Sequence, residues 1–97
     1  MRHFFRTQLM PADVLDVADE FFPTLPLDRT AHTARSRTYS GILGTLHLTV
    51  KKEGGHYTFV QIQTDQIGES RLDRNAKRYF VKLHRVADPS HKLEAAY

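Results

Sequence analysis

The segment TLHLTVKKEGGHYTFVQIQT, residues 45–64, constrains the fold more than any other part of the chain. On both sides of its Gly54-Gly55 pair, apolar side chains alternate with polar ones, which is the period of a strand with one buried face. A glycine pair between two such strands is typical of a tight turn, because glycine adopts left-handed backbone angles without a steric penalty. The segment therefore predicts an antiparallel hairpin with one apolar face.

The apolar pattern also selects between two registers for this hairpin. A loop of two residues would set Leu48 opposite a glutamine. A loop of three residues, 53–55, sets Leu48 opposite Val60 and Leu46 opposite Ile62, so that apolar residues meet apolar ones. We therefore expect the three-residue loop.

The second face of the predicted hairpin is polar, with two aromatic residues in it. If the helices cover the apolar face, the second face lies open to water, to a ligand or to another chain. Aromatic rings beside cations and amides resemble the surfaces of single-strand nucleic-acid binders, while burial against a second subunit explains exposed aromatics equally well. The candidate ligand or interface residues are His47, Thr49, Lys51, Tyr57, Phe59, Gln61 and Gln63.

Two amphipathic helices flank the hairpin in the sequence. In PADVLDVADEFF, residues 11–22, apolar residues recur every three or four positions after an initial proline, and Pro23 closes the pattern. In GESRLDRNAKRYFVKLHRV, residues 68–86, Ser70 and Asp73 have the spacing of a capping box. One side of this second helix is expected to be apolar, with Leu72, Ala76, Tyr79, Leu83 and Val86.

The opposite side of the second helix carries a basic stripe, composed of Arg71, Arg74, Arg78, Lys82 and Arg85. The net charge of +3 is concentrated in this part of the chain. Five cations in register could neutralise the phosphates of a nucleic acid. They could equally form the solvated face that every amphipathic helix needs, or pair with the acidic side of the first helix at Asp13, Asp16, Asp19 and Glu20.

The remaining segments complete an α+β fold. Residues 2–9 and 35–40 are predicted strands, and residues 23–34, which contain two prolines and no period, are predicted to be a loop. The expected order is β-α-β-β-β-α, with an antiparallel sheet of about four strands and both helices on one face. Residues 1–90 form one domain in this interpretation, and residues 91–97 form a C-terminal tail.

This predicted order is similar to that of a minimal helix-grip protein, in which a curved antiparallel sheet holds a long C-terminal helix. Most of the long sheet of that family is missing here. The resemblance implies a carrier of, or an enzyme for, small apolar ligands, with a cavity between the sheet and the Tyr79/Phe80 side of the helix.

Several kinds of chemistry lack support in the sequence. The chain has no cysteine, which excludes disulfides and thiolate sites and fits a reducing cytoplasm. No two of its six histidines have the spacing of metal ligands, so a metal site would require distant histidines such as His47 and His84 to meet in the folded chain. No serine lies in a nucleophile motif. The N-terminal residues contain no apolar run of the length that a signal peptide or membrane span requires.

The sequence therefore predicts a small cytoplasmic binding module that is not an enzyme, binds no cofactor or metal, does not enter a membrane, and self-associates as a homodimer through its polar-aromatic sheet face. The alternatives are a helix-grip carrier or enzyme for a small apolar ligand, and a protein that contacts nucleic acid through the basic stripe.

Overall fold

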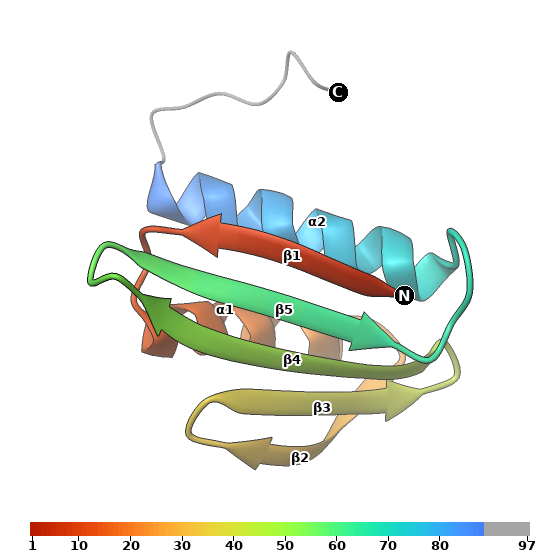
Figure 1. Cartoon of the computed structure of the whole chain (residues 1–97). Helices are drawn as coiled ribbons and strands as arrows, with labels where there is room; N and C mark the ends of the chain where they lie inside the picture. Colours follow the sequence, from red (N-terminus) through yellow and green to blue (C-terminus); the bar gives the residue numbers. More distant parts are fainter. Residues whose placement is uncertain (89–97) are drawn as a thin grey trace.

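The computed structural model describes residues 1–88 of the 97-residue chain; the predicted tail at 91–97 lies outside the described residues. A five-stranded antiparallel sheet has the strand order β1-β5-β4-β3-β2 (Figure 1). The elements follow one another as β1 (Arg2–Thr7), α1 (Pro11–Phe21), η1 (Phe22–Thr24), β2 (Leu27–Thr33), β3 (Ser36–Gly41), β4 (Gly44–Glu53), β5 (Tyr57–Thr64) and α2 (Arg71–Ala87).

Both helices lie on the same face of the sheet, as predicted. Helix α1 passes behind β4 and α2 runs beside β1 and β5, with the two helices in contact (Figure 1). The first strand is inserted next to the last one, so that β1 and β5 are neighbours although they are far apart in the chain. This leaves β1 and β2 as the two edges of the sheet, and no element of residues 1–88 covers the second face.

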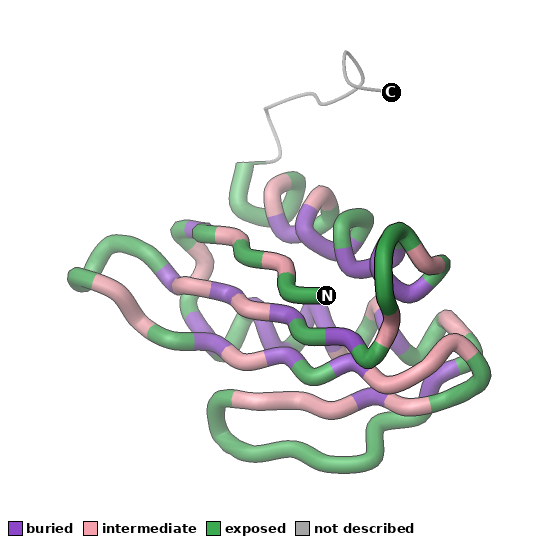
Figure 2. The backbone as a smooth tube through the Cα atoms, turned by 45° about the vertical axis from the view of Figure 1, so that its right-hand side comes forward, coloured by how far each residue is buried: buried purple, intermediate pink, exposed green. Residues whose placement is uncertain are grey.

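The predicted loop at residues 23–34 is wrong in its central part, because residues 27–33 form the edge strand β2. Apart from Leu27, every residue of β2 is exposed, and this strand is green along most of its length in Figure 2. A shift of register between Arg29 and Ala31 also interrupts its alternation. An edge strand that is exposed to solvent on both faces has no alternation of apolar and polar residues, and the sequence pattern therefore did not indicate it. With β2 included, the sheet has five strands and not about four.

The hairpin of β4 and β5 has the predicted faces but not the predicted register. Its loop has three residues, as expected, but they are 54–56, because Glu53 pairs with Tyr57. Gly54 and Gly55 both adopt left-handed backbone angles, with φ of 59° and 81°. Each residue of β4 therefore pairs with a residue of β5 two positions beyond the predicted one, so that Val50 lies opposite Val60. A change of two positions keeps every side chain on its predicted face.

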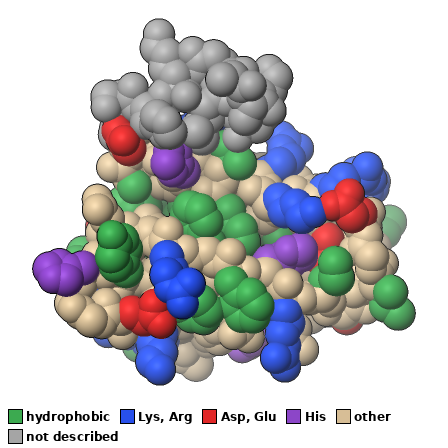
Figure 3. Space-filling model, turned by 45° about the horizontal axis from the view of Figure 1, so that its top comes forward, with side chains coloured by type: hydrophobic (Ala, Val, Ile, Leu, Met, Phe, Trp, Pro, Cys, Tyr) green, Lys and Arg blue, Asp and Glu red, His purple; other side chains and the backbone are tan. Residues whose placement is uncertain are grey.

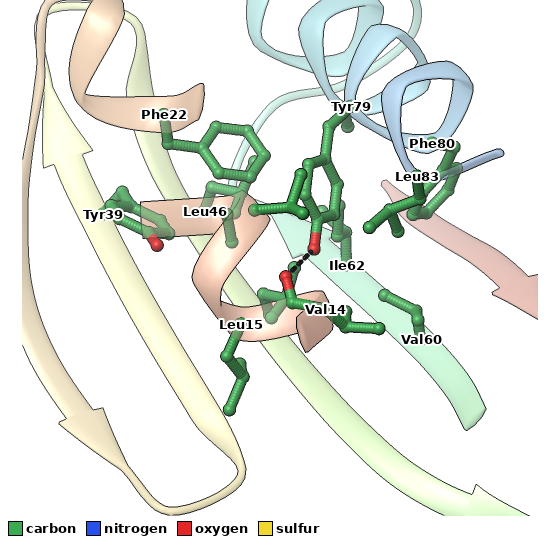
Figure 4. Packing of buried hydrophobic residues seen from close by; sticks show 14 of the residues in the cluster. Val14, Leu15, Phe22, Tyr39, Leu46, Val60, Ile62, Tyr79, Phe80 and Leu83 are labelled. Atoms are coloured by element: carbon green, nitrogen blue, oxygen red, sulfur yellow. Dashed lines mark hydrogen bonds between the residues drawn. The ribbon is translucent and has the colours of Figure 1, made fainter. Parts of the chain in front are cut away.

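The core lies between the sheet and the helices (Figure 4). Leu46, Leu48, Val60 and Ile62 are completely buried, which confirms their assignment to the inner face of the hairpin. Tyr79 of α2 is buried as well, and its hydroxyl donates a hydrogen bond of 2.7 Å to the carbonyl oxygen of Val14 in α1. Each large apolar side chain buried in this way contributes about 1.5–3 kcal/mol to stability.

Local signals set the ends of the helices. Pro11 occupies the first turn of α1, and a short 3-10 turn that contains Pro23 follows the helix. Helix α2 begins after Ser70, whose hydroxyl accepts a hydrogen bond of 3.0 Å from the backbone N–H of Asp73, as the capping box predicts. Val86 was expected on the buried side of α2, but it lies in the last turn and is 44% exposed.

Within residues 1–88, neither helix combines the length and the apolar character needed to cross a membrane.

Candidate binding surface

All seven candidate residues of the hairpin lie on the sheet face that points away from the helices, which we call the open face. The pairing of β4 with β5 aligns them in rows, with Lys51 opposite Phe59, Thr49 opposite Gln61, and His47 opposite Gln63. Tyr57 is the first residue of β5 and is 47% exposed. The structure thus brings the whole predicted set together on one surface.

Strand β1 adds three residues to the open face that the sequence analysis missed. Its pairing with β5 sets Arg2 opposite Gln63, Phe4 opposite Gln61, and Arg6 opposite Phe59. The alternation in RHFFRT could have indicated this face, but only the tertiary pairing shows that β1 lies beside β5.

Two aromatic rings and three cations occupy neighbouring positions of β1, β5 and β4 on the open face. We call them the Phe4–Phe59 band and define it as Arg2, Phe4, Arg6, Lys51 and Phe59. The rings of Phe4 and Phe59 are stacked, with centroids 5.5 Å apart and an interplanar angle of 23°. The guanidinium carbon of Arg6 lies 4.8 Å from the centre of the Phe59 ring, which is the geometry of a cation–π contact. Phe4 is 53% exposed, so its ring remains accessible.

The charge of this band is positive overall. Arg6 also pairs with Glu53 through a contact of 2.9 Å between Nε and Oε1, so its charge is compensated. Arg2 and Lys51 form no ion pair with a carboxylate of residues 1–88. Hydrophobic and basic side chains lie close together on the side of the molecule shown in Figure 3.

The part of the open face that lies away from this band, on β3 and on the first half of β4, carries hydroxyl side chains and the imidazole of His47. The hydroxyl of Thr38 and Nδ1 of His47 are 2.8 Å apart, and the hydroxyls of Ser40 and Thr45 are 2.9 Å apart. These short side chains offer donors and acceptors beside the aromatic half of the surface.

A buried polar cluster lies on the opposite side of the sheet, at the start of α2. The carboxylate of Asp73 is 1% exposed and accepts hydrogen bonds from His3 Nε2 at 2.7 Å, Thr64 Oγ1 at 2.8 Å and Ser70 Oγ at 2.6 Å. Burial raises the pKa of Asp73, but the hydrogen bonds from Ser70, His3 and Thr64 outweigh it and hold the pKa below its usual value.

This cluster does not have the geometry of a catalytic triad. Nucleophilic catalysis requires a hydroxyl that is hydrogen-bonded to a base, which a third group then orients. Here the imidazole of His3 and the hydroxyl of Ser70 both bind the carboxylate of Asp73. The arrangement ties β1, β5 and α2 together, and we assign it a structural role.

A second polar cluster surrounds Asp19 of α1. Its carboxylate accepts hydrogen bonds from the Tyr39 hydroxyl at 2.7 Å, Arg37 Nε at 3.0 Å and Arg29 Nη1 at 3.1 Å. Burial raises the pKa of Asp19, and the hydrogen bonds from Tyr39 and Arg37 reverse that effect, so its pKa is lowered. Asp19 therefore pairs with cations of β2 and β3, whereas the sequence offered α2 as a partner of this acidic side.

The basic stripe lies on the exposed side of α2, as its period predicts, and all five of its members are exposed. Three of them, Arg78, Lys82 and Arg85, border a groove beside the C-terminal end of α1. The stripe and the open face belong to different surfaces of the molecule, because α2 covers the inner face of the sheet.

The histidines of the described residues do not gather. His3 binds Asp73 beneath the sheet, while His47 lies on the open face, away from the helix that carries His84. Residues 1–88 contain no cluster of three or more His, Asp or Glu side chains that could hold a metal ion.

A comparison with protein-family models and with curated proteins found no match to this chain. The geometry of its surfaces is therefore the basis for a functional proposal.

Proposed function

We propose that this protein is a non-catalytic binding module that holds single-stranded nucleic acid on the open face of its sheet. The observation that carries the proposal is the Phe4–Phe59 band, in which a stacked and accessible aromatic pair lies among three cations on an uncovered sheet. Proteins that bind single strands combine a positive surface for the backbone with aromatic rings on which bases stack.

The chemistry of the band fits both parts of such a ligand. A base can stack on the ring of Phe4, whose exposed fraction of 53% leaves it accessible to solvent. Arg2 and Lys51 lie on either side of the aromatic pair and can contact successive phosphates. The amides of Gln61 and Gln63, in the same rows, can donate hydrogen bonds to base edges or accept them.

Self-association, which the sequence analysis favoured, remains a second candidate. It is supported by the exposure of two aromatic side chains, Phe4 and Tyr57, on the same face. The uncompensated charges of Arg2 and Lys51 argue against it, because a face-to-face dimer would bring like charges together in a desolvated interface. An anionic ligand, in contrast, complements both charges.

The helix-grip alternative has less support from the packing. Tyr79 is fully buried and Phe80 is 9% exposed, and their rings contact Phe22 of η1 and Phe5 of β1. These side chains fill the space in which the resemblance implies a ligand cavity. A ligand there would have to displace part of the core.

The direct test is the binding of labelled oligonucleotides of about 10 nucleotides, a length within the usual site sizes for single-strand binders, measured by fluorescence anisotropy. We expect single-stranded oligonucleotides to bind more tightly than duplexes. The Phe4→Ala variant should bind about 5- to 150-fold more weakly, which corresponds to the loss of about 1–3 kcal/mol for one stacked base. Because Phe4 is largely exposed, the variant should retain its fold.

Salt dependence and matched cation variants test the electrostatic part. With two or three phosphates neutralised, the logarithm of the binding constant should fall with the logarithm of the salt concentration with a slope of about −1.4 to −2.1, since each phosphate of a single strand contributes about −0.7. Arg2→Ala should weaken binding and reduce this slope. Arg74→Ala, which removes a cation from the stripe on α2, is the matched control and should have little effect.

Light scattering of the free protein completes the experiment. A dimer that Phe4→Ala converts to a monomer, together with an absence of oligonucleotide binding, would refute the proposal in favour of self-association. A preference for duplexes that is lost in the Arg78→Glu, Lys82→Glu double variant would assign nucleic-acid binding to the basic stripe instead.

A further inference from the structure

A groove on the helical side of the molecule has a composition that separates it from the rest of the basic stripe. It lies between the last residue of α1 and the outer side of α2, and the described residues that line it are Phe21, Arg78, Val81, Lys82, Arg85 and Val86. Its volume of about 670 Å³ lies in the range of sites for small molecules.

The lining combines three apolar with three cationic side chains, which we call the apolar floor (Phe21, Val81 and Val86) and the cationic rim (Arg78, Lys82 and Arg85) of the groove. Val86 is 44% exposed, and Phe21 and Val81 are partly exposed, so each of the three apolar side chains is accessible to solvent. No carboxylate occurs among the described residues that line the groove. Long cationic side chains often cover apolar surface with their stems, but here part of the apolar surface stays accessible between them.

Two of the cations have no carboxylate partner within residues 1–88. The guanidinium of Arg78 donates a long hydrogen bond of 3.4 Å to the neutral side-chain oxygen of Asn75. Neither Arg78 nor Lys82 forms an ion pair with a carboxylate within residues 1–88. They lie four positions apart on α2, so their side chains project from the same side of the helix.

We propose that this groove binds a small amphipathic carboxylate, a free single-chain acid of the fatty-acid type. The carboxylate would accept hydrogen bonds from Arg78 and Lys82 at the rim, and the aliphatic chain would lie on Phe21, Val81 and Val86. Charge complementarity selects an anion, and the apolar floor selects a hydrophobic body over a small inorganic ion. This inference does not depend on the proposed function of the open face, because the two surfaces share no residue.

Calorimetric titration of the full chain with dodecanoate, below the concentration at which it forms micelles, tests the proposal. We expect saturable binding with one site per chain. Dodecanol tests the role of charge and should bind at least about tenfold more weakly, since a charge-assisted hydrogen bond contributes about 1.5–3 kcal/mol. Acetate tests the role of the chain and should also bind at least about tenfold more weakly, since each buried methylene contributes about 0.8 kcal/mol.

Variants on a single helix locate the site. Lys82→Glu should weaken dodecanoate binding at least about tenfold, and Val86→Ser should weaken it by a smaller factor. Arg74→Glu makes the same change of charge on α2 away from the groove and should leave the affinity within about twofold. Both Lys82 and Val86 are exposed, and a circular dichroism melt of each variant checks that the fold is retained.

Three results would overturn the proposal. These are equal binding of dodecanol and dodecanoate, equal losses in Lys82→Glu and Arg74→Glu, and binding to vesicles of an anionic phospholipid without binding of free dodecanoate. The last result would identify the stripe as a membrane-surface contact. Oligonucleotide binding by the open face can succeed or fail independently, because Phe4→Ala should leave dodecanoate binding unchanged.

Discussion

The carboxylate of Asp73 should be the most sensitive polar group for the stability of this fold. It is 1% exposed and accepts three hydrogen bonds, from a strand at the sheet edge, from the end of β5 and from the residue that caps α2. Asp73→Ala would leave the side chains of His3, Thr64 and Ser70 without their acceptor. We expect a loss of about 3–5 kcal/mol in the free energy of unfolding, the usual cost of removing one partner from a buried charged contact.

Asp73→Asn removes the negative charge while keeping nearly the same side-chain shape. The amide retains one acceptor oxygen, and the Ser70 hydroxyl can rotate to accept from its nitrogen, so we expect a smaller loss of about 1–2 kcal/mol. Urea unfolding followed by circular dichroism measures both variants. If Asp73→Ala unfolds the protein completely, the asparagine variant still tests the reasoning.

The pH dependence supplies an independent check of the same carboxylate. Because the pKa of Asp73 is lower in the folded protein than in the unfolded chain, its ionisation stabilises the fold above the unfolded-state pKa of about 3.9. That contribution is lost as the pH falls through the folded pKa. The difference in stability between the wild type and Asp73→Asn should therefore shrink below about pH 4. A loss below about 1 kcal/mol for Asp73→Ala, or a difference between wild type and Asp73→Asn that does not change with pH, would refute this account.

Three further predictions concern the sheet, all measured by urea unfolding. Leu48→Ala should cost about 2–5 kcal/mol and His47→Ala less than about 1, because the first is buried and the second exposed; equal losses would contradict the assignment of the hairpin faces. Tyr39→Phe should cost about 1.5–3 kcal/mol, since it removes a hydroxyl that donates to a carboxylate, and an unchanged stability would show that this bond contributes nothing. Gly44→Ala should cost about 3 kcal/mol, because φ is 121° and a Cβ would lie 2.5 Å from a neighbouring side chain. Gly54→Ala should cost about 1 kcal/mol, because φ is 59° and nothing lies within 4 Å of the added Cβ. A larger loss for Gly54→Ala than for Gly44→Ala would contradict this reasoning.

The open face could be predicted in part. Seven of its residues follow from the alternation of the hairpin, because a period of two assigns each side chain to a face whatever its exact partner. For the same reason the shift of the loop to residues 54–56 changed the partners without changing the faces. Phe4 and its neighbouring arginines could not be assigned to this surface, because their place depends on a pairing between β1 and β5 that spans most of the chain.

The groove beside α2 could not be predicted from the sequence. The helical period placed Arg78 and Lys82 on the polar side, and that assignment is confirmed by their exposure. The groove forms because Phe21 of α1 lies beside this part of α2, and the sequence does not show that the two are neighbours.

The local features of this protein follow directly from its sequence. The capping box at Ser70, the prolines at both ends of α1 and the two faces of the hairpin each depend on residues only a few positions apart, whose steric and hydrogen-bonding preferences act within one turn or one strand. Tertiary packing sets the edge strand β2, the exact register of the hairpin, the neighbour of β1 and the position of Phe21 in the same groove as part of the stripe. Each of these depends on how whole elements pack together, because an apolar period shows that a face is buried without showing which other element covers it.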